Sequence, residues 1–164
     1  MASWDEIIDQ QLVQSGSCYA AALANAPPEL AFYAAAPVAD GEGWKHVWSE
    51  DHVQNIQVSE DRFENVTISE AAGLAKALMD GSAPNGVWLG KTKYKFVQRD
   101  ANFEVNDQRV VCLFVNRSRG GAHIVSTEKT VVVGLYNEEI GGQTSGNCKR
   151  AVLRFVEYLI ENGC

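Results

Sequence analysis

Residues 82–94 read SAPNGVWLGKTKY, and this stretch decides how the second half of the chain is interpreted. Pro84, Asn85 and Gly86 are turn-forming residues, and the apolar run 87–89 that follows them has the length of one short strand. Gly90 and Lys91 can form a two-residue connection to a second strand at 93–97. The stretch therefore predicts an antiparallel hairpin rather than a helix.

The chain after this hairpin continues in the same way. Apolar or alternating segments separated by polar turns predict further strands at 103–105, 110–115, 123–126 and 130–136. Short connections of this kind are typical of an antiparallel meander. The last segment, 147–162, has apolar residues at helical spacing, and we expect Asn147 to cap that helix and Gly163 to end it.

The chain before residue 82 mixes helices and strands. Ser3 and Glu6 form a capping-box pattern before apolar residues at helical spacing, which predicts a helix over 3–14. We expect a second helix at 70–79, capped by Ser69 and ended by Gly81. Strands are expected at 19–23 and 30–36 around the Pro27-Pro28 turn, a loop at 37–43, and a protruding hairpin built from 56–58 and 66–68.

These elements predict an α+β fold in one domain that spans residues 1–164. We expect a single antiparallel sheet of about six to seven strands, with the N- and C-terminal helices packed on one face and an inserted β-hairpin. No apolar run is long enough to span a bilayer, and the N-terminus has no signal-peptide pattern. A cytoplasmic protein is therefore the expectation.

Charge is distributed unevenly along the chain, whose formal net charge is −7. Residues 1–90 contain 13 acidic and 3 basic residues, whereas residues 91–164 contain 8 acidic and 11 basic residues. The overall negative charge argues against binding to nucleic acid or to strongly anionic membranes. The basic C-terminal part is consistent either with a local cationic face or with an ordinary solvated surface.

Signs of catalysis are weak. The sequence has no nucleophile elbow, phosphate-binding loop or zinc-protease motif, so we expect no enzyme, no cofactor and no metal. The four cysteines show no paired metal spacing and are expected to be reduced thiols. One alternative stays open: a small enzyme or ligand sensor would require Cys112 and His123 to meet within hydrogen-bond reach in a pocket.

Two aromatic residues at opposite ends of the chain are more informative. Trp4 begins the first helix and Tyr158 lies near the end of the last one. If the two helices lie side by side, these rings can form a groove of the kind that binds proline-rich peptides. The alternative is that Trp4 only anchors its helix to the sheet.

Several segments, taken in order, resemble the profilin family. They are the Ser3-Trp4 start, Tyr33-Ala34-Ala35, the turn and hairpin of 83–94, Gly120-Gly121-Ala122, the strand end at 134–139, and the last helix at 157–163. The longer regions at 38–43 and 55–68 resemble the apicomplexan branch of that family. The resemblance implies a protein that binds monomeric actin, regulates its polymerisation, and binds proline-rich segments of filament nucleators such as formins.

The resemblance also implies which residues do this. The positions implied for actin are Lys93, Lys95, Arg109, Arg117, Ser126, Lys149, Arg150 and Arg154, with a further contact from the hairpin near 60–64. The positions implied for proline-rich ligands are Trp4, Ile7, Tyr33, Tyr158, Leu159 and Cys164. Ile7 and Cys164 depart from the aromatic residues that are common there, so we expect weak polyproline binding.

The charge and the resemblance also predict the oligomeric state and the binding of nucleic acid and lipid. We expect a monomer that binds no nucleic acid and that binds phosphoinositides weakly, near Lys149, Arg150 and Arg154. The main alternative is a profilin-like adaptor that binds proline-rich peptides with little affinity for actin. An actin polymerisation assay separates the two.

Overall fold

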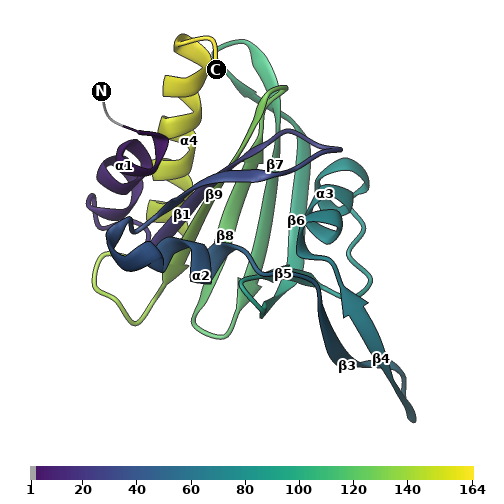
Figure 1. Ribbon diagram of the computed structural model, residues 1–164. Coiled ribbons are helices and arrows are strands. Elements are labelled where there is room, and N and C mark those ends of the chain that lie inside the picture. Colours follow the sequence, from purple (N-terminus) through teal and green to yellow (C-terminus); the bar gives the residue numbers. More distant parts are fainter. Residues whose placement is uncertain (1–2) are drawn as a thin grey trace.

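The computed structural model describes residues 3–164 and has a curled, seven-stranded antiparallel sheet at its centre (Figure 1). The strand order is β2-β1-β9-β8-β7-β6-β5, so the first two strands join the edge of the meander formed by the later ones. The predicted α+β class and strand number are therefore confirmed. The strands are β1 (Ala20–Asn25), β2 (Phe32–Ala36), β5 (Val87–Leu89), β6 (Thr92–Val105), β7 (Gln108–Arg117), β8 (Gly120–Ser126) and β9 (Thr130–Asn137).

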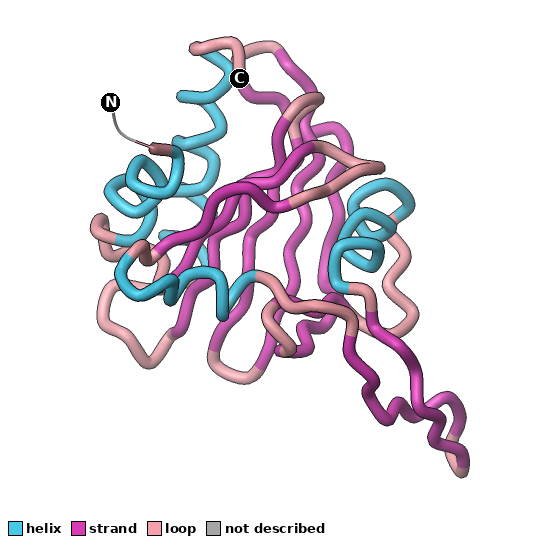
Figure 2. The backbone as a smooth tube through the Cα atoms, viewed as in Figure 1, coloured by secondary structure: helices cyan, strands magenta, loops and turns pink. Residues whose placement is uncertain are grey.

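The two terminal helices pack on one face of this sheet, as predicted (Figures 1 and 2). Helix α1 (Trp4–Ile8) continues as a π-helical segment, η1 (Asp9–Val13), and α4 (Ser145–Glu161) lies beside it. The Ser3 hydroxyl accepts a hydrogen bond from the Glu6 amide at 3.3 Å, so the expected cap forms. The core of this layer contains Ile8 and Leu12 together with Phe155.

The cap of α4 differs from the prediction. Thr144, not Asn147, stands at the N-cap, and its hydroxyl accepts a hydrogen bond from the Asn147 amide at 3.0 Å. The helix therefore starts three residues earlier than a cap at Asn147 implies, because the first turn, Ser145–Asn147, carries no apolar side chain.

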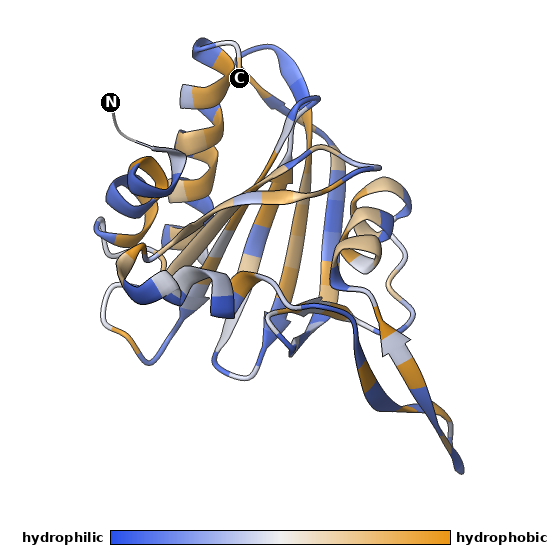
Figure 3. Cartoon of the chain, viewed as in Figure 1, coloured by the Kyte–Doolittle hydropathy of each residue, from blue (hydrophilic) through white to orange (hydrophobic). Residues whose placement is uncertain are grey.

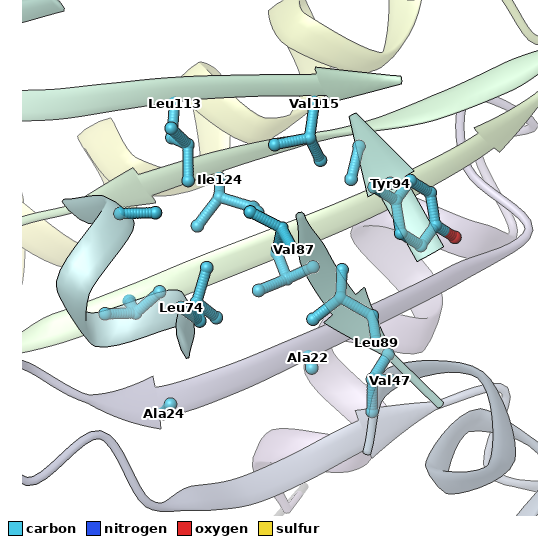
Figure 4. Close-up of a cluster of buried hydrophobic side chains, with 14 of the residues drawn as sticks. Ala22, Ala24, Val47, Leu74, Val87, Leu89, Tyr94, Leu113, Val115 and Ile124 are labelled. Atoms are coloured by element: carbon cyan, nitrogen blue, oxygen red, sulfur yellow. The ribbon is translucent and has the colours of Figure 1, made fainter. Parts of the chain in front are cut away.

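The opposite face of the sheet is covered by α2 (Glu42–Val47) and α3 (Glu70–Asp80). Figure 4 shows this second core, in which Leu74 of α3, Val47 of α2 and Ile124 of the sheet belong to one buried cluster. The turn η2 (Ala39–Gly41) and the first two residues of α2 lie where we predicted a loop over 37–43. The helix is only six residues long, which is too short to give a periodic pattern.

The inserted hairpin consists of β3 (His52–Ser59) and β4 (Arg62–Ile68), and it projects from the body of the protein (Figure 1). Figure 3 shows polar and apolar residues alternating along it, and most of its side chains are exposed. The hairpin is confirmed, with strands longer than expected. Ser69 does occupy the N-cap of α3, but its side chain makes no capping hydrogen bond.

The strand β6 unites two segments that the sequence presented as separate strands. Its pairing with β7 shifts register between Phe96 and Gln98 and again between Asp100 and Phe103. Bulges of this kind break the alternation of side chains without ending the strand. The residues between 97 and 103 therefore looked like a loop although they remain in the sheet.

Gly134 of β9 permits an unusually close approach of α4 to the sheet. A Cβ atom there would lie 2.5 Å from Val152 Cγ2 and within 3.1–3.3 Å of the Cys18 and Cys148 sulfur atoms. The two buried thiols are 3.5 Å apart and rest on this strand. The cysteines are free, in agreement with the prediction. Within residues 3–164, no helix has the length and apolarity required to cross a bilayer.

Candidate functional site: an aromatic surface and a cationic helix face

The terminal helices bring together most of the residues expected to bind proline-rich ligands. Trp4, Ile7, Tyr158 and Cys164 are partly buried side chains that pack against the same core cluster between α1, α4 and the sheet. We call these four residues and Tyr33 the terminal aromatic surface. Side chains from the two ends of the chain therefore pack against one core cluster.

Helix α1 is fixed to the sheet edge by a specific contact. The Asp5 carboxylate accepts a hydrogen bond from the Ala35 amide of β2 at 2.9 Å. Because β2 is the edge strand of the sheet, this amide lacks a neighbouring strand and is available to the side chain. The bond holds Trp4 against the same edge that carries Tyr33.

Tyr33 completes this surface from β2, with 42% of its side chain exposed. The pKa of Tyr33 is raised above its ordinary value. Burial is the main cause and the nearby Cys164 adds to it, while a hydrogen bond with the Thr130 side chain partly offsets the increase. The phenol is therefore protonated at neutral pH and can donate a hydrogen bond to a ligand carbonyl. The C-terminal Cys164 lies next to it.

The remaining predicted residue has a different role. Leu159 is 1% exposed and belongs to the core beneath the surface, so it supports the aromatic residues and cannot contact a ligand directly. Tyr158 stacks on Phe155 with ring centroids 5.7 Å apart, which orients its ring.

The basic residues of α4 form a second feature. Lys149, Arg150 and Arg154 are all exposed on the helix, and we call them the α4 cationic patch. The Lys149 ammonium lies 5.7 Å from the centre of the Phe103 ring of β6, within cation–π range. A depression of about 480 Å³ separates the helix from β6 and is lined by Phe103, Glu104, Val105, Asn106, Arg150, Leu153, Arg154 and Glu157.

Only some of the strand residues can join this patch. Lys93 and Lys95 alternate along β6 with Tyr94 and Phe96, which pack on the α3 side, so both lysines project from the face that carries α4. Sequence reasoning missed Phe103 and Leu153, although Leu153 follows Arg150 at the i+3 spacing that places it on the same helix face.

The other three predicted residues are not brought together with α4. Arg117 hydrogen-bonds the Tyr19 hydroxyl at 3.3 Å on the α3 side. Arg109 has the same strand parity and projects to that side too. Ser126 is 7% exposed, and its hydroxyl donates to the Thr127 carbonyl. The eight residues therefore do not form one continuous surface.

Cys112 and His123 do line one pocket, of about 240 Å³, together with Asp100, Ser145 and Lys149. Within residues 3–164 no hydrogen bond joins these two side chains, and His123 Nε2 instead lies 2.9 Å from the Ser145 hydroxyl. Burial lowers the pKa of His123 to about 4, helped by the charge of Lys149, while the hydrogen bond with Ser145 raises it. The imidazole is therefore neutral at pH 7.

The thiol in this pocket is also unsuited to act as a nucleophile. Burial raises the pKa of Cys112 to about 11, Lys149 lowers it, and Asp100 raises it. A thiol with such a pKa is almost entirely protonated at neutral pH, whereas the thiolate is the reactive form. Among residues 3–164, no cluster of three or more His, Cys, Asp or Glu side chains could hold a metal ion.

Comparison with known proteins gives a consistent result. The family model described as Profilin matches residues 2–164. A profilin from Plasmodium falciparum is 32% identical over 171 residues, covering 98% of this chain and 96% of its own length, and one from Plasmodium berghei is 28% identical.

Solved structures agree in fold. Acanthamoeba castellanii profilin II aligns with a TM-score of 0.65 at 24% identity, covering 99% of this chain and 100% of its own. Mouse profilin IIa, solved in complex with a double repeat from the FH1 domain of mDia1, aligns with a TM-score of 0.50 at 17% identity, covering 99% and 100% of the two chains.

Proposed function

Because this chain belongs to the profilin family, we propose that it binds monomeric actin through the face carrying the α4 cationic patch and proline-rich segments through the terminal aromatic surface. Profilins are non-enzymatic actin-binding proteins, and the chain is one of them.

The observation that carries the proline-rich half is the meeting of the two chain ends. Trp4, Ile7 and Tyr158 pack against one cluster, and Tyr33 lies exposed beside Cys164. Exposed rings on a rigid support suit a polyproline II helix, which loses little entropy on docking. The mouse protein of the same fold was solved with an FH1 repeat, which supports a formin segment as the partner.

We expect this binding to be weak. Ile7 and Cys164 supply no ring where the family commonly has one. Each missing aromatic contact removes about 0.5–1.5 kcal/mol beyond the loss of buried area. The decisive measurement is retention on poly-L-proline resin at low salt. Trp4→Ala should abolish retention and leave actin binding intact, and a wild-type protein that is not retained at all would contradict the proposal.

The actin half rests on charge and exposure. Lys149, Arg150 and Arg154 are exposed on one helix, and Lys95 projects from the same face of the sheet. A cationic surface on an acidic protein would steer an acidic partner and fix its orientation. Binding at one end of the actin monomer would leave the other end free to add to a filament.

The test is the critical concentration of actin assembly with and without the protein. We expect Lys149→Glu with Arg150→Glu to weaken the effect strongly while the fold is retained. The matched control is Lys45→Glu with Lys76→Glu, which also reverses two charges at exposed positions but lies on α2 and α3, away from the patch, and should leave the effect unchanged. Equal activity of the patch variant and the wild type would refute the assignment.

A second candidate is the adaptor that binds proline-rich peptides with little affinity for actin. It is favoured if the wild type is retained on poly-L-proline and does not change actin assembly at any ratio. We expect the protein to act as a monomer in the cytoplasm, in association with the actin cytoskeleton. Light scattering at working concentration and fractionation of cells that express it test these two points.

A further inference from the structure

Helix α2 carries two tryptophans that the fold leaves open to solvent. Trp44 is 36% exposed and Trp48 is 41% exposed, although the indole is among the side chains with the most to gain from burial. The two residues are spaced i,i+4, and the Trp48 amide donates to the Trp44 carbonyl at 3.1 Å. Trp48 stands at the C-cap with an extended backbone (φ −147°, ψ 149°), and both indoles line the same two depressions, so the two rings lie close together at the end of the helix.

These rings are not required to hold α2 on the sheet. Val47 is completely buried in the α3-side core. Gly43 lies so close to β2 that a Cβ atom there would be 2.4 Å from the Ala36 carbonyl carbon. The helix is thus anchored by a buried valine and a backbone contact, and the indoles are available for another purpose.

Two depressions flank the pair of rings. The first, about 560 Å³, has a mainly apolar lining of Leu30, Ala31, Phe32 and Ala71, with Glu29 at its edge. The second, about 430 Å³, is lined by Lys45, Ser49, Glu50, Asp51 and Lys91. Trp44 and Trp48 line both. A ligand can therefore contact the indoles from an apolar side and from a polar side at once.

The carboxylates around the rings lack partners. Within residues 3–164, Glu29, Glu50 and Asp51 form no ion pair and their side chains accept no hydrogen bond. Residues 29–51 contain five carboxylates and one lysine. Lys45 and Lys91 also line the second depression, but neither is paired with these acids. The excess negative charge favours a positively charged partner.

We propose that Trp44, Trp48 and the adjoining carboxylates form a docking surface for a basic peptide segment of another protein. The apolar depression accepts a large aliphatic side chain of that segment, and the indole faces accept Lys or Arg through cation–π contacts. Glu29, Glu50 and Asp51 neutralise the remaining cations. A run of lysines without apolar residues would fill only part of this surface.

This surface is independent of the two sites proposed above. Trp44 and Trp48 flank the α3-side core, whereas Trp4 and Tyr158 pack on the α4 side. The basic segment could therefore be held while actin and a proline-rich ligand are bound. A failure of the actin or polyproline assays would not affect this proposal, because those assays and the peptide-binding assay test different residues.

Fluorescence anisotropy with a labelled peptide tests the proposal. The binding peptide is GKLRGKLRG, and the controls are GELEGELEG, which reverses the charge, and GKGRGKGRG, which removes the leucines. The wild type should bind the first peptide saturably, with an affinity that falls as salt is raised, and should bind each control at least about tenfold more weakly. Trp44→Ala with Trp48→Ala should weaken binding by about tenfold or more, and Trp4→Ala should leave it unchanged.

If the double tryptophan variant fails to fold, Glu50→Gln with Asp51→Asn decides the matter. This pair changes charge but not shape at exposed positions, and it should weaken binding and flatten the salt dependence. The proposal would be overturned if the wild type did not bind the peptide, if either control peptide bound as tightly as GKLRGKLRG, or if both double variants kept the affinity of the wild type. So would a wild-type dimer in sedimentation that Trp44→Ala with Trp48→Ala converts to monomer, since the surface would then join two copies of this chain.

Discussion

Removal of the Glu70 carboxylate should strongly destabilise the fold at a point away from the binding surfaces. Glu70 is 2% exposed. Its two oxygens accept hydrogen bonds of 2.8 Å from the Gly90 and Lys91 amides and from His52 Nε2. His52 Nδ1 in turn accepts from the Gln54 amide group, which fixes the tautomer. One side chain therefore joins α3, the β5–β6 turn and the base of the projecting hairpin.

The magnitude follows from the three donors that Glu70→Ala would leave behind. Each buried donor that loses its partner costs about 1–3 kcal/mol, and the part-buried Gly90 and Lys91 amides fall at the low end of this range because water can reach them. We therefore expect a loss of about 3–5 kcal/mol in the free energy of unfolding, against a typical total of about 5–15 kcal/mol for a domain. Glu70→Gln should cost less, because the amide oxygen still accepts hydrogen bonds. It should still cost something, because the NH₂ group of Gln would face a donor.

The turn itself explains why the carboxylate is needed. Gly90 and Lys91 both have positive φ, of 58° and 65°, and a lysine in this region is disfavoured without support. Urea denaturation gives the free energies, and hydrogen exchange of the Gly90 and Lys91 amides reports the local effect. The reasoning would be refuted if Glu70→Ala unfolded within about 0.5 kcal/mol of the wild type, or if protection of both amides were unchanged.

Three further predictions concern the other helix and the buried pocket. Thr144→Ala should destabilise the fold by about 0.5–2 kcal/mol in thermal denaturation through loss of the α4 cap, and Thr144→Ser should restore most of it. The pKa of His123 is about 4 in the folded protein and about 6.5 in the unfolded chain, so between these pH values the unfolded chain binds a proton that the folded protein does not. The free energy of unfolding should therefore fall as the pH drops from 6.5 to 4. His123→Gln should remove that part of the slope, and identical slopes in urea titrations would contradict the assignment. Liposomes containing phosphoinositide should retain the protein only at low salt, and Lys149→Glu with Arg150→Glu should abolish retention; strong retention at physiological salt would contradict a weak interaction.

The sequence predicted the sheet and both terminal helices because these elements carry strong local signals. The Gly90-Lys91 turn is an example, since residues that form two-residue connections stood between two apolar runs. The gathering of Trp4 and Tyr158 was predicted from the resemblance and from the amphipathic character of the helices. Helix α2 was missed because six residues show no period, and with it the exposed pair Trp44 and Trp48.

The surface residues were harder to predict, for a reason specific to strands. Side chains of a strand alternate between faces, so Arg117, two residues beyond Val115 in β7, lies on the α3 side with that valine. Arg109 follows the same rule. The alternation along β7 shows in the sequence that Arg109, Arg117 and Val115 share one face of the strand. Only the structure shows that this face is the one opposite α4. Ser126 was misplaced because a serine at a strand end gives no indication of burial.

The close approach at Gly134 has a consequence for how genetic data on this protein should be interpreted. A methyl group added there would press against Val152 and Cys148 of α4 and shift that helix, which carries both Tyr158 and the Lys149–Arg154 cations. Gly134→Ala would then lose two unrelated partners together, although it touches neither. A genetic selection for variants that lose only one of the two interactions should therefore not recover a substitution at Gly134. A variant at Gly134 that loses both interactions would indicate a shift of α4, not a direct contact of residue 134 with either partner.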